Sequence, residues 1–540
     1  MKGKNQQLKI LAGGLLVALL TGTLVPVLAL AEPLVSEKYT IADYCGESDF
    51  SVFKDNDGYL YAAGSNAVGQ LGRGNVGNGK KLEPLEGKIL DKKVTSFDTG
   101  KSGFVLAITE DGKLYGWGNN ANGQLAKEID KETTENNYYG VPFVIELASG
   151  CKPLAVDAGA THSLLLSEDG NVYAWGQNNR GQLGLSLEIK RTVRVTTPTL
   201  IPREKFGGEK IKQIATTEST SFALTETGIL YSWGDSDYGQ MGDGVADPIE
   251  NDLPDLINTP TRTLLSNVKK VSAEGTTAMA ITNDGEVYVW GNNNFKQFGN
   301  PEWEMLVKAK YQDDSKKAEL ADDWSSVPVK IENVYTISGE KVETAFKDIL
   351  CGGTTNFLLS ATGEVYSFGT GGSGELGFSV VDAEKKYQNP YVQMPKMTVP
   401  TKITFYEPLS IEEITQTENE AFVGKTPVDT TKQQQVVVEE LLNSCGSRTF
   451  VKDENGQVWS WGDNADGLAS GGNIAPTDVP VLSTLFRDKD YDVTIQEKNY
   501  LLEPIIGLSV IYGTGIAFLI ATEIKRAKQR KLALDVKPEK

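Results

Sequence analysis

Histidine is almost missing from this sequence, since His162 is the only one among 540 residues. Metal sites built from several histidines are therefore excluded, and a Ser-His-Asp triad would have to use His162 itself. His162 follows Gly159-Ala160-Thr161 inside a repeated unit, and we expect it to be structural. Carboxylates are plentiful, so composition does not exclude a two-carboxylate glycosidase, but no pair stands out along the chain.

Basic residues are also scarce: 53 Lys and Arg stand against 72 Asp and Glu, which gives a formal net charge of -19. They gather at the two ends of the chain, with Lys2, Lys4 and Lys9 at the start and a basic run near the end. Non-specific binding of nucleic acid depends on Lys and Arg that neutralise phosphates. The sequence therefore predicts no nucleic-acid partner.

One seven-residue pattern, G-x-[LV]-[YW]-x-[WFA]-G, recurs along the chain and organises it. Its clearest copy is Gly170-Asn171-Val172-Tyr173-Ala174-Trp175-Gly176, and further copies begin at Gly58, Gly112, Gly228, Gly285, Gly363 and Gly456. An apolar strand and a tight turn precede each copy, as in Glu168-Asp169-Gly170, which is a strong hairpin signal. The strand within the pattern is apolar on both faces, which predicts burial between stacked sheets.

A polar turn follows each of these strands and returns to the pattern G-Q-L-G, as in Gly181-Gln182-Leu183-Gly184. A proline-containing segment comes next, for example Thr197-Pro198-Thr199-Leu200 or Thr259-Pro260-Thr261. Proline suits an edge strand, where a missing N–H breaks no ladder hydrogen bond. Each unit therefore predicts a small antiparallel sheet with the proline segment at its edge.

The combined pattern D-G-x-[LV]-Y-x-W-G-x-N-x-x-G-Q-L-G resembles the regulator of chromosome condensation repeat family, over roughly residues 43–486. That family folds as a β-propeller with about seven four-stranded blades. The resemblance and the seven copies predict an all-β fold, a seven-bladed β-propeller closed into one ring. Eukaryotic members are exchange factors for the small GTPase Ran and bind chromatin, and the family is also similar to secreted bacterial inhibitors that bind β-lactamases.

The two ends of the chain predict export and a membrane anchor. Residues 1–31 are typical of a signal peptide, with an apolar run from Ile10 to Leu24 before a cleavage site at Ala29-Leu30-Ala31. Residues 504–522 carry no charge and are long enough for a transmembrane helix of about 28 Å. Residues 523–540 form a basic tail, which favours the cytoplasmic side. The sequence thus predicts a single-pass protein of the cell membrane with its propeller outside the cytoplasm, of a bacterial type.

The predicted propeller covers residues 39–491, with insertions near 301–324 and 380–438. Insertions in repeat proteins map to loops, often on a binding face. Within the predicted span, small residues recur every four positions at Ser509, Gly513, Ala517 and Ala521. Such a ridge lets membrane helices approach closely, which makes weak dimerisation an open alternative.

The sequence has only four cysteines, and an exported protein permits disulfides between them. Cys45, Cys351 and Cys445 fall at nearly equivalent places in the first, sixth and seventh units. A disulfide between Cys45 and Cys445 would fasten a closed ring where its ends meet. Pairing of Cys351 with Cys445, or free buried thiols, are the alternatives, since a disulfide needs Cα atoms within about 7 Å.

Two acidic turns, Asp235-Ser236-Asp237-Tyr238-Gly239 and Asp463-Asn464-Ala465-Asp466-Gly467, are similar to calcium loops only superficially. Neither is followed by the acidic residue that such a loop needs at its twelfth position. Both occupy the polar turn that follows the repeated strand, so we interpret them as turns. No metal and no cofactor is predicted.

The residue before the first glycine of the G-Q-L-G turn varies between copies, and it predicts where a ligand binds. These residues are Val68, Asn122, Arg180, Tyr238, Phe295, Ser373 and Asp466. A constant framework with variable tips can be specialised for a partner. Aromatic residues favour protein interfaces, so Tyr238 and Phe295, together with Arg180, are the candidate ligand-binding residues. Packing of the two aromatic side chains against a neighbouring loop is the alternative.

These observations predict a non-catalytic scaffold that binds a protein or cell-envelope ligand through its loops. An inhibitor of an extracellular enzyme is a second hypothesis, based on the similarity to β-lactamase inhibitors. A carbohydrate-active enzyme is a third, because the many carboxylates leave a glycosidase pair open.

Overall fold

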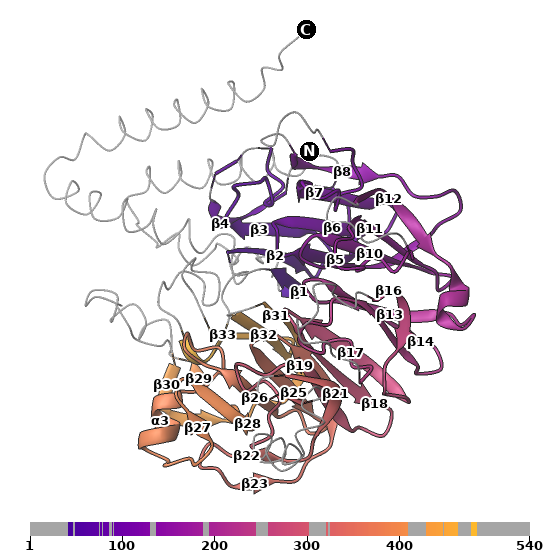
Figure 1. Cartoon of the computed structure of the whole chain (residues 1–540). Helices are drawn as coiled ribbons and strands as arrows, with labels where there is room; N and C mark the ends of the chain where they lie inside the picture. The colour runs from indigo at the N-terminus through magenta and orange to yellow at the C-terminus, as the bar shows by residue number, and fades with distance from the viewer. Residues whose placement is uncertain are drawn as a thin grey trace, which may run out of the picture. The chain divides into compact units, whose positions relative to one another are not determined.

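The computed structural model describes residues 41–482 except 47–48, 75, 78, 86–88, 90, 130–136, 187–193, 245–256, 302–319, 322–323, 409–427, 446–447 and 463–476. Nearly all of the regular structure in this part of the chain is β-strand. The exceptions are a one-turn 3₁₀ helix, Arg203–Phe206, and the short helix α3, Val380–Lys385. The predicted all-β fold class is confirmed for the described residues (Figure 1).

Each copy of the repeated pattern lies in its own sheet, within which four strands are antiparallel neighbours in chain order. The first strands are β1 (Ile41–Gly46), β5 (Val94–Gly100), β9 (Pro153–Ala158), β13 (Ile211–Thr216), β17 (Val268–Glu274), β24 (Phe346–Cys351) and β31 (Val438–Cys445). The second strands are β2 (Phe50–Asp55), β6 (Phe104–Thr109), β10 (His162–Ser167), β14 (Thr220–Thr225), β18 (Thr277–Thr282), β25 (Thr355–Ser360) and β32 (Arg448–Asp453).

The repeated pattern itself forms the third strands, and the segment after the polar turn forms the fourth. The third strands are β3 (Leu60–Gly64), β7 (Leu114–Asn119), β11 (Val172–Gln177), β15 (Leu230–Gly234), β19 (Val287–Asn292), β26 (Val365–Thr370) and β33 (Val458–Gly462). The fourth strands are β4 (Gly79–Pro84), β8 (Tyr138–Ile145), β12 (Arg194–Ile201), β16 (Ile257–Arg262), β21 (Trp324–Ile331), β28 (Lys396–Lys402) and β34 (Thr477–Leu482). Pro198 and Pro260 lie in β12 and β16, the edge strands of their sheets, as predicted.

The first strands lie at the centre of the fold, because each contacts the first strands of the sheets before and after it. The series β1, β5, β9, β13, β17, β24 and β31 returns to its start, since β31 also contacts β1 (Figure 1). Sheets arranged around a common centre through their first strands are the architecture of a β-propeller. The predicted propeller is therefore confirmed.

Extra strands decorate the fifth and sixth sheets, in and around the segments predicted as insertions. β20 (Leu320–Ala321) extends the fifth sheet, and β22 (Val334–Tyr335), β23 (Lys341–Val342) and β27 (Val392–Gln393) extend the sixth. β29 (Phe405–Pro408) and β30 (Val428–Gln434) form a separate two-stranded sheet. The second predicted insertion also contains β28, so part of it belongs to the regular sixth sheet.

The Asp-Gly turns form the predicted tight hairpins between second and third strands. In the third sheet Gly170 has φ +81°, which a residue with a Cβ adopts only at a cost. Its N–H donates to Ser167 O at 2.9 Å, and Ser167 Oγ donates to the Asp169 carboxylate at 2.5 Å. Both the backbone and the side chains of this turn thus fix the register of the two strands.

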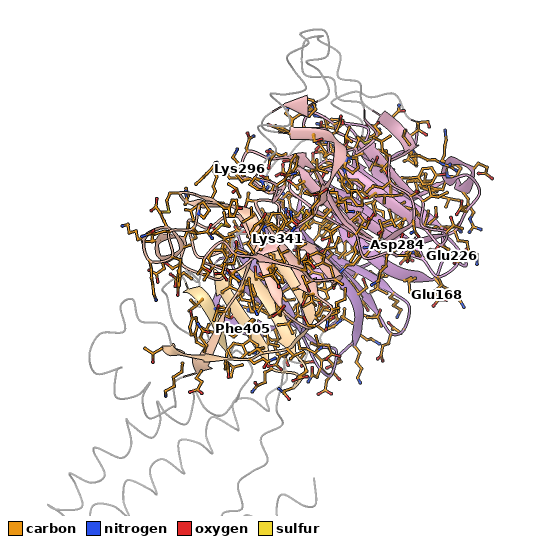
Figure 2. All side chains as sticks on the ribbon, turned by 90° about the horizontal axis from the view of Figure 1, so that it is seen from below. Glu168, Glu226, Asp284, Lys296, Lys341 and Phe405 are labelled. Carbon is orange, nitrogen blue, oxygen red and sulfur yellow. The ribbon has the colours of Figure 1, made fainter. Side chains whose placement is uncertain are left out.

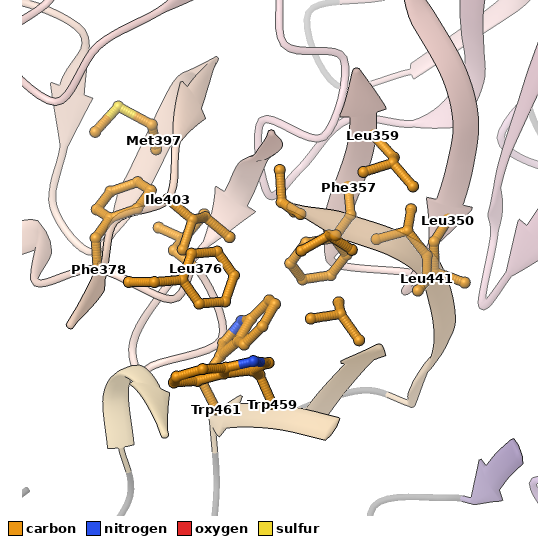
Figure 3. Close-up of a cluster of buried hydrophobic side chains, with 14 of the residues drawn as sticks. Leu350, Phe357, Leu359, Leu376, Phe378, Met397, Ile403, Leu441, Trp459 and Trp461 are labelled. Carbon is orange, nitrogen blue, oxygen red and sulfur yellow. The ribbon is translucent and has the colours of Figure 1, made fainter. Parts of the chain in front are cut away.

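The core lies between neighbouring sheets, where the aromatic residues of the third strands are buried. Trp175 packs against Phe104, Leu106 and Leu125 of the preceding sheet and is fully buried. Figure 3 shows the corresponding cluster between the sixth and seventh sheets, with Trp461 among its buried side chains. The predicted burial of the repeated strand on both faces is confirmed, and replacing such a tryptophan by alanine costs about 3–5 kcal/mol.

The predicted signal peptide, transmembrane helix and basic tail, residues 1–31, 504–522 and 523–540, all lie outside the described residues. Within residues 41–482, as far as they are described, none of the helices has the length and apolar character needed to cross a membrane. The membrane anchor therefore stays a prediction.

Candidate functional site

The two kinds of turn lie at opposite ends of the sheets. In the third sheet His162, at the start of β10, pairs with Gly176 near the end of β11, and Leu166 pairs with Val172 at the Asp-Gly end. The polar turns after the third strands, here called WG turns, therefore share one end of the propeller, here called the WG face. Figure 2 shows Lys296, from the fifth WG turn, on the side away from Glu168, Glu226 and Asp284, which lie in the hairpin turns between second and third strands.

The same hydrogen bond to a buried asparagine recurs in four of the described WG turns. In the third copy the Leu183 N–H donates to the side-chain carbonyl of Asn178 at 3.0 Å, and both residues are fully buried. Equivalent bonds join Leu71 to Asn66, Leu125 to Asn120 and Phe298 to Asn293. The asparagine side chain thus takes the place of a backbone acceptor for this buried N–H. A buried N–H without an acceptor would cost about 1–3 kcal/mol of stability.

A second bond holds the variable tip residue of each turn. The backbone N–H of the tip donates to the side chain of the buried glutamine, or in the sixth copy glutamate, two residues later. The pairs are Val68 with Gln70, Asn122 with Gln124, Arg180 with Gln182, Tyr238 with Gln240, Phe295 with Gln297 and Ser373 with Glu375, at 2.7–3.0 Å. The backbone of every described tip is therefore fixed, while its side chain takes no part in fixing it.

Tyr238 and Phe295, two of the candidate residues, are among the exposed large hydrophobic side chains, with exposed fractions of 38% and 39%. They occupy equivalent tips of the fourth and fifth sheets, whose first strands are neighbours. Phe295 also has a cation beside it, because Lys396 Nζ lies 5.6 Å from the centre of its ring. Their exposure distinguishes them from the tryptophans of the third strands, which are buried between sheets and stabilise the fold.

Arg180, the third candidate, is engaged with the next WG turn. Its Nη1 lies 3.1 Å from a carboxylate oxygen of Asp237 and 3.9 Å from one of Asp235. Burial, followed by the charge of Asp237, raises the pKa of Asp235 to about 6. Because its side chain is still 36% exposed, Arg180 both ties the third WG turn to the fourth and remains accessible to a ligand.

The turns between first and second strands form an inner rim on the same face. Backbone hydrogen bonds run from Ser102 N to Ala160 O, from Ala160 N to Glu218 O and from Glu218 N to Gly275 O. Lys101 forms an ion pair with Glu218 across two of these turns. The WG face thus has a rigid inner rim as well as fixed outer tips.

Three carboxylates from different sheets lie just inside this rim. Asp98 accepts a hydrogen bond from Ala158 N at 2.7 Å, and Asp157 accepts one from Thr216 Oγ1 at 2.6 Å. Burial, and then the charge of Asp98, raise the pKa of Glu274 to about 7, and burial raises that of Asp98 to about 6. Burial and the Asp98 charge also raise the pKa of Asp157. Sequence analysis missed this group because its members are about 60 residues or more apart and follow no spacing rule.

His162 is fully buried and its Nε2 lies 2.9 Å from Ser221 Oγ of the next sheet. Burial lowers its pKa to about 3, so the ring is neutral at physiological pH. These contacts join two sheets, in keeping with the structural role that the sequence predicted. Among the described residues, no group of three or more His, Cys, Asp or Glu side chains could hold a metal ion.

The predicted disulfide between Cys45 and Cys445 is not tested, because the side chain of Cys445 lies outside the described part of the chain. Cys45 Sγ donates to the Asp98 carboxylate at 2.7 Å. The rival pairing of Cys445 with Cys351 is absent, since Cys351 is a free thiol whose pKa burial raises to about 12. A buried neutral thiol of this kind is chemically inert.

The family described as the RCC1-like domain matches residues 23–407. The ultraviolet-B receptor UVR8 of Arabidopsis thaliana is 32% identical over 288 residues, which cover 52% of this chain and 60% of UVR8. The E3 ubiquitin-protein ligase HERC2 of Homo sapiens is 28% identical over 332 residues, which cover 61% of this chain and 6% of HERC2. The chain thus spans less than two thirds of either relative.

Solved structures share the fold. A chain in the crystal structure of Kap60 bound to yeast RCC1 (Prp20) aligns with a TM-score of 0.56 and 20% identity, covering 84% of this chain and 86% of that one. Human WBSCR16 aligns with a TM-score of 0.51 and 22% identity, covering 75% of this chain and 85% of its own. Because the family match extends over more than half of its residues, this protein belongs to the RCC1-like domain family.

Proposed function

We propose that this protein is a non-catalytic scaffold that binds a protein partner through the WG face of its propeller. The observation that carries the proposal is the construction of the tips: in six described WG turns the same hydrogen bond holds the backbone of the tip residue, and the side chain of that residue takes no part in it. Rigid positions with exposed aromatic side chains bind with little loss of conformational entropy. Tyr238, Phe295 and Arg180 are the proposed contact residues.

The propeller is proposed to be one closed ring of seven blades. The cycle of contacts among the first strands, which returns from β31 to β1, supports this number. A closed ring leaves no unpaired sheet interface, which suits a rigid binding platform.

We also propose that the propeller lies outside the cytoplasm and is held at the cell membrane. Support comes from the sequence: the signal-like residues 1–31, the uncharged residues 504–522 and the basic residues 523–540. The partner would then be an extracellular or cell-envelope protein. Protease added to intact cells should digest the propeller and spare the tail, and digestion only after lysis would contradict this arrangement.

One observation would favour the alternative of a carbohydrate-active enzyme, namely the three carboxylates that lie inside the rim. The hollow above them, lined by Lys101, Gly159, Thr217, Glu218 and Glu274, has a volume of about 10 Å³. Such a volume holds about one water molecule and cannot admit a sugar ring. We therefore favour protein binding. An inhibitor of an extracellular enzyme is a special case of that proposal, in which the partner is an enzyme.

The proposed function can be tested by capture of partners on the full-length, detergent-solubilised protein, followed by mass spectrometry. Tyr238→Ala and Phe295→Ala should each reduce the amount of partner that is captured relative to wild type, because aromatic contacts dominate such interfaces. Leu154→Ala is the matched control, since Leu154 is 49% exposed near the Asp-Gly end of the third sheet. Equal capture by all the variants would contradict the proposal.

A further inference from the structure

The fifth WG turn differs from all the others described, because a lysine occupies a position that otherwise holds glycine. Lys296 has φ +64°, within the left-handed region. The equivalent glycines of the other described turns also have positive φ: Gly69, Gly123, Gly181, Gly239 and Gly374, with φ from +71° to +84°. A residue with a Cβ is unfavourable in this region, and such conformations gather at functional sites. A lysine thus occupies a position whose backbone conformation favours glycine.

A second lysine reaches the same turn from the neighbouring sixth sheet. Lys396, at the start of β28, donates from Nζ to the carbonyl oxygen of Asn294 at 2.6 Å, beside the Phe295 ring. A backbone carbonyl and an aromatic ring therefore hold this ammonium group. Neither partner carries a formal charge, so the positive charge of Lys396 is not neutralised by these contacts.

Apolar side chains accompany the two ammonium groups. Phe295 is 39% exposed, and Met394, two residues before Lys396, is 48% exposed. A small polar hollow lies beside them, lined in part by Lys296, Gln393 and Thr398. We call the four residues Phe295, Lys296, Met394 and Lys396 the Lys-Phe surface. Methionine and aromatic side chains adapt to and anchor apolar groups of a ligand.

We propose that the Lys-Phe surface binds an acidic segment of the partner protein, with aromatic or aliphatic side chains between its carboxylates. This inference rests on the proposed function of the WG face and names the chemistry of the partner. Charge complementarity carries it, because Lys296 and Lys396 lie together beside Phe295 in a chain whose formal net charge is -19. Complementary charge fixes the register of a complex more than its total affinity.

The contrast with the adjacent tips supports this choice of partner. Arg180 is matched by the two carboxylates of Asp235 and Asp237, so the third and fourth WG turns together have no excess of positive charge. Beside the fifth turn, by contrast, two lysines lie together, Lys296 in the turn and Lys396 on β28. An acidic segment that meets this surface would place its apolar residues against Phe295 and Met394.

The test uses two fluorescein-labelled decapeptides, one with alternating Glu and Leu and one with alternating Gln and Leu. Fluorescence anisotropy measures their binding to the full-length protein at low ionic strength. The wild type should bind the Glu-Leu peptide more tightly than the Gln-Leu peptide. The double variant Lys296→Gly, Lys396→Met should lose roughly tenfold in affinity for the Glu-Leu peptide and hold both peptides about equally.

Lys152→Met is the matched control, because the Lys152 side chain is 77% exposed at the Asp-Gly end and should leave binding unchanged. Lys296→Gly should fold, since glycine fits the equivalent turns. Equal affinity of wild type and double variant for the Glu-Leu peptide, or tighter binding of the Gln-Leu peptide by the wild type, would each overturn the inference. If Tyr238→Ala abolishes partner capture while the double variant captures normally, the proposed function stands and this inference fails.

Discussion

The indole N–H groups of the tryptophans that precede the second glycine of the repeated pattern donate to the preceding sheet. Trp117 Nε1 donates to Gln70 O, Trp233 to Gln182 O and Trp461 to Glu375 O, at 2.9 Å. The accepting residue is the one whose side chain holds the tip. A single residue of each WG turn therefore joins the tip to the packing between sheets.

We expect Trp117→Phe to destabilise the protein by about 1–3 kcal/mol, because the buried Gln70 carbonyl loses its donor. The sixth copy shows a natural remedy: Phe368 replaces the tryptophan, and Asn356 Nδ2 donates to Gln297 O at 2.8 Å. Val105 occupies the position of Asn356 in the second sheet. Val105→Asn added to Trp117→Phe should thus restore part of the loss in chemical denaturation, and an additive further loss would contradict this account.

Gly239→Ala should cost about 3 kcal/mol. Gly239 has φ +71°, and a Cβ there would lie 2.5 Å from Ser326 N of the neighbouring sheet. The control is Gly112→Ala, with φ +73° and no atom within 4 Å of its Cβ, which isolates the backbone cost of about 1–2 kcal/mol. Equal unfolding midpoints for the two variants would show that the close approach is unimportant.

Residue roles were only partly predictable from the sequence. The repeated tryptophans, the hairpin glycines and the exposed tips follow from pattern and spacing. The two contacts of Gln182 do not follow from them. Its side chain accepts from Arg180 N in the same turn, whereas its backbone carbonyl accepts from Trp233, which lies 51 residues away in the next sheet. The pattern W-G-x-N-x-x-G-Q-L-G contained the signal, but only the fold shows what its asparagine and glutamine bind.

At the scale of elements, the first strands bring Asp98, Asp157 and Glu274 together at the centre. Each carboxylate is half-buried; the charge of Asp98 raises the pKa of Asp157 and of Glu274, and the charge of Glu274 also raises that of Asp157. Other groups near them are Asp43, Lys101, Glu218 and the Cys45 thiol.

Stability should rise as the pH falls from about 8 to about 5. The folded-state pKa values of Asp98 and Glu274, about 6 and about 7, lie above their ordinary values, so the folded protein binds more protons than the unfolded chain in this window. The thermal midpoint should therefore increase on acidification. Glu274→Gln should flatten this dependence and raise the midpoint at pH 8, whereas Glu226→Gln, in an exposed hairpin turn between β14 and β15, should do neither.

The seam between the last and first sheets is built differently from the others. Ala63 stands where the other third strands carry Trp or Phe, and it pairs with Ser51. Arg448 of the last sheet is buried, and its Nη1 donates to Ser51 Oγ at 3.0 Å. Tyr44 and Phe450 pack across the same seam with ring centres 4.3 Å apart. At this seam the hydrogen bond from Arg448 to Ser51 thus takes the place of the hydrogen bond that a tryptophan indole donates to the preceding sheet elsewhere.

Arg448→Met should lower stability by about 1–3 kcal/mol and should speed amide exchange in β1 and β31 more than in β13, because the Ser51 partner is lost at the seam. Arg262→Met, which removes an exposed side chain stacked on Tyr231, is the control. Uniform acceleration across all first strands would contradict a special role for this seam.

For the molecule as a whole, the propeller fold and the strand order within each unit could be predicted from sequence, because each unit carries its own turn and burial signals. The extra strands of the sixth sheet could not, since β22 and β27 are two residues long and their pairing with β28 depends on tertiary contacts. The central carboxylates were missed for a related reason: they meet only when the sheets surround a common centre.

The most direct measurement places a photoreactive phenylalanine at single positions of the full-length protein and identifies cross-linked partners by mass spectrometry. If the WG face binds a protein, the label at Tyr238 or Phe295 should cross-link one partner, and the same label at Leu154 or Leu200 should not. Leu200 is 44% exposed and lies on β12 near the Asp-Gly end. Cross-linking of that partner from Leu154 or Leu200, with none from Tyr238 or Phe295, would contradict the proposed function.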